Sequence, residues 1–232
     1  MARSPSDEAV DRRHGAHSQT RGPHAKKKSF TPTEQARADV QEKRRAFLSE
    51  IAEVDPNDLV FLDESGCNIA MTASYGRAPA GVRVADSKPA NWGKNLTVVG
   101  AIKNDRIVCH RTFEGAMNKP RFIDFIRHVL CPRLSPGAVV VLDNLRAHHA
   151  PEVRDAVEGV GAHVLYLPPY SPDLNPIELC WSFAKSCLRR LAQRTESGLR
   201  KAINNTMLRV RTDQLRGWFK HCGFGQRKRS SL

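Results

Sequence analysis

The sequence predicts an α/β protein in which helices flank a mixed β-sheet, and three observations carry this prediction. Two short apolar runs end in aspartates, Asp63 and Asp143. Runs of four or five large or β-branched apolar residues are typical of strands buried on both faces of a sheet. Two further strand-like stretches flank Asn104-Asp105, a two-residue connection typical of a β-hairpin. Segments of helical periodicity alternate with these strands, which is the pattern of a sheet covered by helices.

The first part of the chain is expected to precede the sheet. Residues 1–24 show no apolar periodicity and are predicted to be disordered. Thr31 and the proline after it offer a cap and a first helical residue, so residues 25–54 are interpreted as a linker that contains a helix. The acidic, proline-containing residues 55–58 end that helix. The first strands are then expected at 59–63, 96–103 and 106–113.

The second part alternates helices and strands. Residues 118–134 place several apolar side chains on one helical side. Residues 175–192 carry a core stripe that begins at Ile177 and Trp181 and continues at helical spacing. The expected elements are a helix at 118–134, a strand at 138–143, a helix near 150–159, a strand at 162–167, a helix at 175–192 and helical segments at about 196–211.

Three carboxylates are the strongest candidates for chemistry. Asp63 and Asp143 end strands whose carboxyl ends are expected to meet at one sheet edge, where open α/β sheets place their ligands. Glu178 lies near the start of the helix at 175–192. Clustered carboxylates repel unless a cation neutralises them, and oxygen-only ligands suit Mg²⁺ or Mn²⁺. A site holding two such ions is suited to in-line attack on a phosphodiester, so the trio predicts a nuclease or a strand-transfer enzyme.

Each acid also has a purely structural interpretation. Aspartates at strand ends, such as Asp63 and Asp143, commonly start turns or cap helices. Glu178 can serve as the third residue of a capping box behind Asn175 and Pro176. The combination favours the catalytic interpretation, because the three acids occur together and 34 residues separate the second from the third.

Residues next to the acids are candidates for supporting roles. Asn144 and His148 follow the second aspartate and are candidates for support beside the metal ligands. The Asn144 amide could orient a carboxylate or bind a DNA-backbone oxygen, and His148 or its neighbour His149 could bind a metal ion or contact a phosphate. A surface or capping histidine is an equally good interpretation of His148. Glu64 is not counted as a ligand, because adjacent residues of a strand point to opposite faces. Trp181 lies on the helix stripe and is expected to pack in the core.

Four stretches of the chain carry a family resemblance. They are residues 61–66 (FLDESG), 75–79 (YGRAP), 141–149 (VLDNLRAHH) and 167–178 (LPPYSPDLNPIE), the last followed by Trp181. With these motifs the chain resembles the DDE transposases of the mariner superfamily, in its bacterial insertion-sequence branch. The resemblance extends over roughly residues 26–224, and the proline-rich stretch that ends at Glu178 is its most specific part.

The resemblance implies a fold, an activity and a set of ligands. It implies a ribonuclease-H-like catalytic domain over 55–193, followed by a basic helical extension over 194–232. Asp63, Asp143 and Glu178 would hold two Mg²⁺ or Mn²⁺ ions. The enzyme would cut double-stranded DNA at transposon ends and join them to a TA-containing target, as a dimer on DNA.

The chain also departs from the family pattern. Complete family members carry helix-turn-helix modules ahead of the catalytic domain, whereas only a linker-like stretch precedes the first strand here. We therefore expect the DNA-reading modules to be missing and a helix-turn-helix polypeptide from an upstream frame to be a partner. A truncated remnant is the other explanation. Two further functions stay open: a catalytically inactive DNA-binding remnant that regulates an intact transposase, and a host nuclease or junction resolvase of the same fold.

Charge and composition fit a nucleic-acid partner. Of the net charge of +13, residues 182–232 contribute +11, whereas residues 55–181 sum to −1. A cationic segment beside an acidic, metal-dependent site suits a polyanionic substrate, although a solvated helix face with a basic tail is the simpler alternative. The six cysteines form no Cys-x-x-Cys pair, and no stretch approaches the length of a membrane span. The protein is expected to be cytoplasmic and nucleoid-associated, with no membrane partner.

Overall fold

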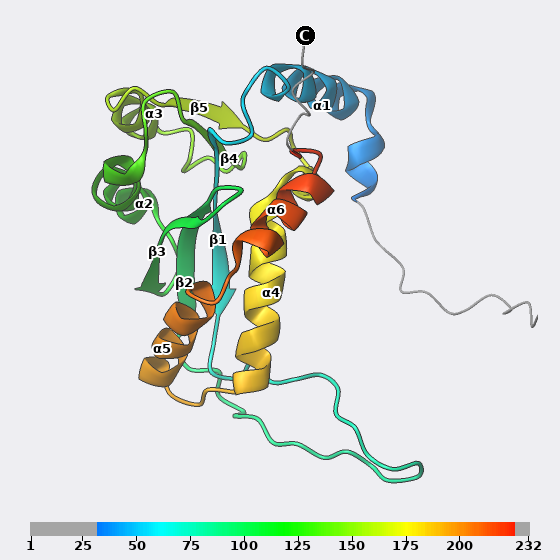
Figure 1. Cartoon of the computed structure of the whole chain (residues 1–232). Helices are drawn as coiled ribbons and strands as arrows, with labels where there is room; N and C mark the ends of the chain where they lie inside the picture. The colour runs from blue at the N-terminus through cyan, green and yellow to red at the C-terminus, as the bar shows by residue number, and fades with distance from the viewer. Residues whose placement is uncertain (1–31, 226–232) are drawn as a thin grey trace, which may run out of the picture. The chain divides into compact units, whose positions relative to one another are not determined.

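A five-stranded mixed sheet forms the centre of the fold (Figure 1). The computed structural model describes residues 32–225, so the expected disordered segment at 1–24 lies outside the described residues. The strands are β1 (Leu59–Cys67), β2 (Leu96–Ile102), β3 (Ile107–Glu114), β4 (Val139–Leu142) and β5 (His163–Tyr166). They lie in the order β3-β2-β1-β4-β5; β1, β2 and β3 are antiparallel neighbours, and β4 and β5 run parallel to β1. The predicted mixed α/β sheet is confirmed.

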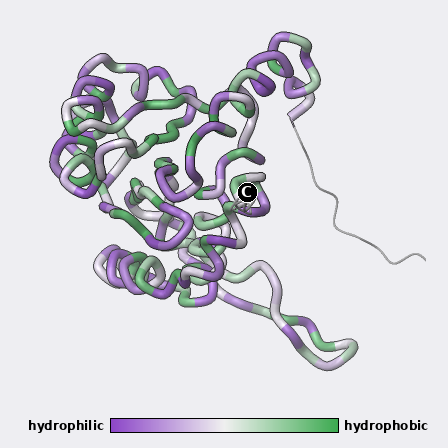
Figure 2. The backbone as a smooth tube through the Cα atoms, turned by 45° about the horizontal axis from the view of Figure 1, so that its top comes forward, coloured by the Kyte–Doolittle hydropathy of each residue, from purple (hydrophilic) through white to green (hydrophobic). Residues whose placement is uncertain are grey.

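Helices cover both faces of this sheet. One group packs with the apolar cluster that contains Phe61, and the other packs with the cluster that contains Leu62, the next residue of β1. Because successive strand residues point to opposite faces, β1 supplies side chains to both clusters. The first group is α1 (Ala38–Ile51), α4 (Pro176–Leu191), α5 (Glu196–Met207) and α6 (Thr212–His221); the second is α2 (Lys119–Phe125) and α3 (Pro151–Glu158). The helices alternate between hydrophilic and hydrophobic colours along their turns in Figure 2, as expected of helices with one buried side.

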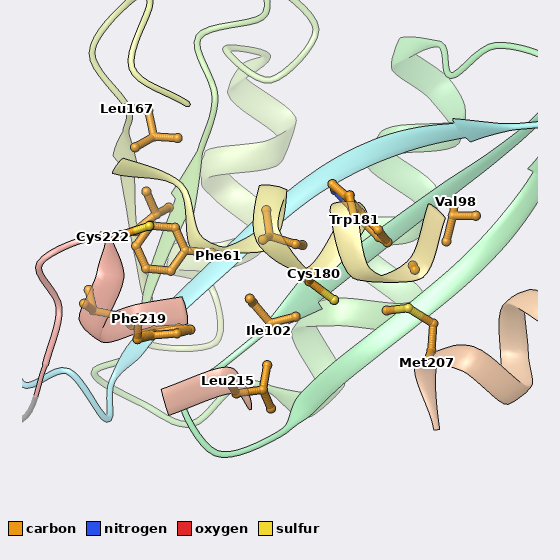
Figure 3. Packing of buried hydrophobic residues seen from close by; sticks show 14 of the residues in the cluster. Phe61, Val98, Ile102, Leu167, Cys180, Trp181, Met207, Leu215, Phe219 and Cys222 are labelled. Carbon is orange, nitrogen blue, oxygen red and sulfur yellow. The ribbon is translucent and has the colours of Figure 1, made fainter. Parts of the chain in front are cut away.

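The last two helices belong to the core of the sheet. Helix α6 was not predicted as a separate helix, yet it buries Leu215 and Phe219 in the same cluster as Phe61. The Phe219 ring lies 5.3 Å from the Phe61 ring in an edge-on arrangement (Figure 3). Helix α5 adds Leu199 and Ile203 to that cluster. The packing is therefore continuous across the expected boundary between residues 193 and 194.

The predicted helix at 118–134 is divided into three segments of different helical pitch. It begins as α2 with an Asn118 cap, continues as a π-helical turn over Ile126–Leu130 and ends in a 3-10 turn over Cys131–Arg133. Pro132 explains why the α-helical pitch does not resume after Leu130, because proline has no backbone N–H and its ring clashes with the carbonyl four residues earlier.

Strand β1 is longer than the predicted strand at 59–63. Its extra residues, as far as Cys67, pair with β2, where Cys67 lies opposite Leu96. Residues 68–94 then form a long excursion without regular secondary structure, which extends past the ends of α4 and α5 in Figure 1. Arg194 ties the base of this excursion to the fold by donating hydrogen bonds to the carbonyls of Ile69 and Met71.

Two further expectations concern composition. All six cysteines are unpaired, and all but Cys187 are buried. None of the helices in the described part of the chain is long and apolar enough to cross a membrane.

Candidate active site

The first two acids lie at the same edge of the sheet. Strands β1 and β4 are parallel neighbours, with Phe61 opposite Val141. Asp63 follows Phe61 by two residues, and Asp143 follows Val141 by two residues. The register therefore brings the two aspartates side by side where these strands leave each other, as the two apolar runs predict.

Asp63 is buried and held by a tryptophan. Its side chain is 8% exposed, and its Oδ2 accepts a hydrogen bond of 3.1 Å from Nε1 of Trp181 in α4. Trp181 is 3% exposed, so its predicted place in the core is confirmed (Figure 3). This hydrogen bond was not predicted from the sequence. Buried indole N–H groups usually have a hydrogen-bond partner, and this rule was the one signal that could have indicated it.

Gly100 makes room for this tryptophan. It lies directly opposite Asp63 on β2. A Cβ atom at this position would be 2.9 Å from Cη2 of the Trp181 ring, closer than such atoms normally approach. The indole can therefore lie over the sheet and reach Asp63 only because residue 100 has no side chain.

Asp143 contacts a buried histidine that also reaches β1. Nδ1 of His148 lies 2.5 Å from Oδ1 of Asp143, and Nε2 of the same ring lies 3.0 Å from Oε1 of Glu64. Nδ1 of His148 and Oδ1 of Asp143 are within ion-pair distance, but the two groups are not aligned as in a hydrogen bond. The ring is 1% exposed and stacks on Phe122, with centroids 4.2 Å apart. The backbone N–H of Leu145 also donates to Oδ1 of Asp143, so the expected turn interaction is present as well.

The two carboxylates determine the charge of this histidine. Burial opposes the charged imidazolium, but the nearby Asp143 and Glu64 outweigh burial and raise the pKa of His148 to about 9. His148 was a candidate to support the second aspartate, and the structure places it there. Glu64 was excluded as a ligand because it points to the opposite face of β1. Glu64 does point to the opposite face from Asp63, and His148 lies between Glu64 and Asp143 and contacts both carboxylates.

Glu178 lies in the first turn of α4 and is exposed. The capping interpretation finds no support, because the side chain of Asn175 makes no capping hydrogen bond. Oδ1 of Asn175 is instead buried without a hydrogen-bond partner among the described residues. The carboxylate of Glu178 is therefore not committed to the helix end.

The acids influence one another electrostatically. Burial raises the pKa of the Asp63 carboxyl to about 7, against the effect of the Glu64 backbone N–H. The negative charges of Glu178, Glu64 and Asp143 raise it further. All three predicted acids therefore belong to one region of negative potential, which a cation would relieve.

Helix α1 fixes the loop that leads into α4. The Arg44 guanidinium donates to both carboxylate oxygens of Asp173, at 3.0 and 2.7 Å, and to Oγ of Ser171 at 2.7 Å. Tyr170, in the same loop, has a φ of 55°, a left-handed conformation that is uncommon for a residue other than glycine. The segment expected to be a linker thus stabilises the loop that positions Glu178.

Asn144 contacts a different histidine. Its Oδ1 lies 2.5 Å from Nε2 of His149, whose ring stacks on Tyr166 at a centroid distance of 4.0 Å. Asn144 is exposed. Of the two residues expected to support Asp143, only His148 contacts it in the structure.

The site fits a divalent cation by its donor chemistry. Its acids offer oxygen ligands, which Mg²⁺ and Mn²⁺ prefer, in a region where negative charge is concentrated around the buried Asp63. In their present orientations, no three His, Cys, Asp or Glu side chains of residues 32–225 form a group able to hold an ion. Asp63 faces Trp181 and Asp143 faces His148. The convergence of all three carboxylates on two ions therefore stays a prediction.

Comparison with known proteins gives one family and one fold. The profile of a family described as DDE superfamily endonuclease matches residues 58–199. No curated protein matches the chain. Among solved structures, the chain is similar to the Mos1 transposase paired-end complex with the left transposon end, with a TM-score of 0.69 and 19% identity over 87% of this chain and 64% of that one.

Two further Mos1 structures show the same likeness. The mariner Mos1 paired-end complex with Mg gives a TM-score of 0.64 and 17% identity, over 88% of this chain and 65% of that one. The catalytic domain of Mos1 mariner transposase gives 0.55 and 16%, over 80% of this chain and 88% of that domain. The chain thus spans slightly less than two thirds of the Mos1 chains in the complexes. At these identities the likeness shows the fold, which is ribonuclease-H-like as the resemblance implied.

Proposed function

The chain belongs to the DDE superfamily endonucleases, and from this premise we propose that it is the catalytic domain of a transposase. In this proposal it performs metal-dependent cleavage of DNA at transposon ends and transfers the cut strands to a TA-containing target. We assign it to the bacterial insertion-sequence branch of the mariner superfamily on the motif that ends at Glu178. Its place of action would be the nucleoid.

One observation carries the proposal. The parallel register of β1 and β4 brings Asp63 and Asp143 to the same sheet edge. Trp181, three residues after Glu178 in α4, donates a hydrogen bond to Asp63. A single hydrogen bond therefore links the helix that carries the third acid to the strand that carries the first.

We propose that Asp63, Asp143 and Glu178 hold two Mg²⁺ or Mn²⁺ ions. Bound there, such ions would activate a hydroxyl nucleophile and stabilise the leaving oxygen of a phosphodiester. The chain itself supplies the orientation. Trp181 holds one oxygen of Asp63, and His148 with the Leu145 backbone holds one oxygen of Asp143. Burial of Asp63 keeps water away from one side of the site.

We further propose a division of labour along the chain. Residues 55–193 would carry the catalytic groups, and the cationic residues within 194–232 would contact DNA phosphates without reading sequence. Reading of the transposon ends would come from helix-turn-helix modules on a partner polypeptide, and the active form would be a dimer on DNA. The net charge of +11 over residues 182–232 supports the phosphate-contacting role.

The test is metal-dependent cleavage by matched variants. The substrate is a duplex that carries the terminal sequences flanking the gene, with Mg²⁺ or Mn²⁺ and the helix-turn-helix polypeptide present. The wild-type chain should nick or join strands. Asp143→Asn should abolish cleavage while DNA binding is retained, because the amide keeps the shape of the side chain but loses its charge. Binding without metal-dependent cleavage by the wild type would instead indicate a non-catalytic regulator, and a preference for branched duplexes would indicate a junction resolvase.

A further inference from the structure

Each of the two aspartates has one carboxylate oxygen held by the protein. Oδ2 of Asp63 accepts a hydrogen bond from Trp181. Oδ1 of Asp143 accepts a hydrogen bond from the backbone N–H of Leu145 and lies within ion-pair distance of His148. No side chain of residues 32–225 forms a hydrogen bond with the other oxygen, Oδ1 of Asp63 or Oδ2 of Asp143, although the backbone N–H of Glu64 lies near the Asp63 carboxyl. Carboxylates that bind metal ions commonly show this division, because an outer partner on one oxygen fixes the direction of the other.

The histidine on Asp143 is itself fixed from three sides. Its Nε2 is within hydrogen-bond distance of Oε1 of Glu64, and its ring stacks on Phe122. Its backbone carbonyl accepts a hydrogen bond of 2.9 Å from the hydroxyl of Tyr166. A ring held at both nitrogens and on one face has a single orientation available. The loop after β4 is thereby attached to β1 through Glu64, independently of the sheet hydrogen bonds.

Burying the Glu64 carboxylate costs stability that a nonpolar side chain at this position would not cost. Glu64 is mostly buried, and its Oε2 has no hydrogen-bond partner among the described residues. Leaving a carboxylate oxygen buried and unpaired is unfavourable. Nonpolar side chains of similar size at both positions would fill the space without that cost. A buried polar pair with one unpaired carboxylate oxygen therefore indicates a role that packing does not need.

We propose that Glu64 and His148 are positioning residues that fix the carboxylate of Asp143 for metal binding. Glu64 orients the imidazole, and the imidazole holds Oδ1 of Asp143 so that Oδ2 is presented at the sheet edge. The inference rests on the proposed function, because it assumes that Asp143 is a metal ligand. It adds two residues that the three-acid motif does not contain, one of them on the opposite face of β1.

The two ring nitrogens can be tested separately. In His148→Asn the amide nitrogen takes the position of Nδ1, so the polar contact with Asp143 is kept and the contact with Glu64 is lost. In His148→Gln the amide nitrogen takes the position of Nε2, so the contact with Glu64 is kept and the contact with Asp143 is lost. If the histidine only filled space, glutamine would be the better replacement because it is larger.

The measurement is Mn²⁺ affinity, followed by the loss of free Mn²⁺ signal in electron paramagnetic resonance, on the full chain without DNA. His148→Gln should weaken Mn²⁺ binding by about 10- to 100-fold, the range found when outer partners of metal ligands are removed. His148→Asn should weaken it less. Because either variant leaves Glu64 without its cation and so weakens the fold, the same pair is also measured in a Glu64→Gln background, where no unpaired charge is buried.

Two outcomes overturn parts of the account in different ways. If Asp143→Asn abolishes Mn²⁺ binding while both histidine variants bind like the wild type, or while glutamine binds at least as well as asparagine, the positioning role is refuted and the metal site stands. If Asp143→Asn binds Mn²⁺ like the wild type, Asp143 is not a ligand. The proposed function then fails, and the positioning role fails with it.

Discussion

Replacing Gly100 by alanine should disturb the active site through a single contact. The added Cβ would be 2.9 Å from Cη2 and 3.4 Å from Cζ2 of Trp181. The ring has little freedom to withdraw, because Trp181 is 3% exposed and its Nε1 is bonded to Asp63. Either the strands separate slightly or the indole moves away from Asp63.

The expected cost follows from these two possibilities. Forcing extra volume into a well-packed core costs about 1–3 kcal/mol, and loss of the indole hydrogen bond costs about 1 kcal/mol. Alanine restricts the unfolded chain and returns about 0.4–1 kcal/mol. We therefore expect Gly100→Ala to lower the free energy of unfolding by roughly 1–3 kcal/mol, a large share of the 5–15 kcal/mol typical of a domain.

The assay is urea unfolding of a double-mutant cycle with Trp181→Phe. Phenylalanine lacks the outer ring atoms that alanine would meet at position 100, so Gly100→Ala should cost less than about 0.5 kcal/mol in that background. Gly66→Ala is the matched control, because a Cβ added to this strand glycine would have no atom within 4 Å; the substitution should not destabilise the protein and should stabilise it by up to about 0.4–1 kcal/mol. An equal cost for Gly100→Ala in both backgrounds would refute the claim that the tryptophan ring is what requires a glycine there.

Three further outcomes are expected. Phe219→Ala should destabilise the protein by about 3–5 kcal/mol in chemical denaturation, since the ring is fully buried, whereas exposed Leu208 tolerates alanine; equal effects would place α6 outside the core. Burial acts to raise the pKa of Asp173, but Arg44 outweighs burial and lowers this pKa. Arg44→Ala should therefore cost about 1 kcal/mol at pH 7. This difference should shrink as the pH falls from about 4 through the lowered folded-state pKa, below which Asp173 is protonated in both the folded and the unfolded state. A difference that grows in acid would contradict this. Affinity for duplex DNA in filter binding should fall steeply with salt and equally for unrelated sequences; strong discrimination between duplexes would reveal a sequence-reading surface.

Most of the architecture was open to prediction from periodicity. The apolar runs before Asp63 and Asp143 identify β1 and β4, and the turn at Asn104-Asp105 identifies the hairpin. The stripe that starts at Ile177 identifies α4. These signals are local, and each is set by burial of one segment against the sheet.

Other features depend on contacts between distant residues and have no local signal. Helix α6 places Leu215 and Phe219 at helical spacing, but its position in the core is seen only in contacts such as that of Phe219 with Phe61. In the same way, Glu64 meets His148 across 84 positions of the chain. Sequence patterns placed Glu64 on the correct face of β1 but could not show what that face contains.

The claim that three acids form one metal site is tested most directly by diffraction from crystals soaked in Mn²⁺, with data collected at the manganese absorption edge. We predict anomalous peaks within about 2 Å of carboxylate oxygens of Asp63, Asp143 and Glu178, with two ions about 3.5–4 Å apart when both are bound. Oδ1 of Asp143 should still face His148. Manganese bound elsewhere, or Asp63 and Asp143 unliganded at saturating Mn²⁺, would contradict this claim.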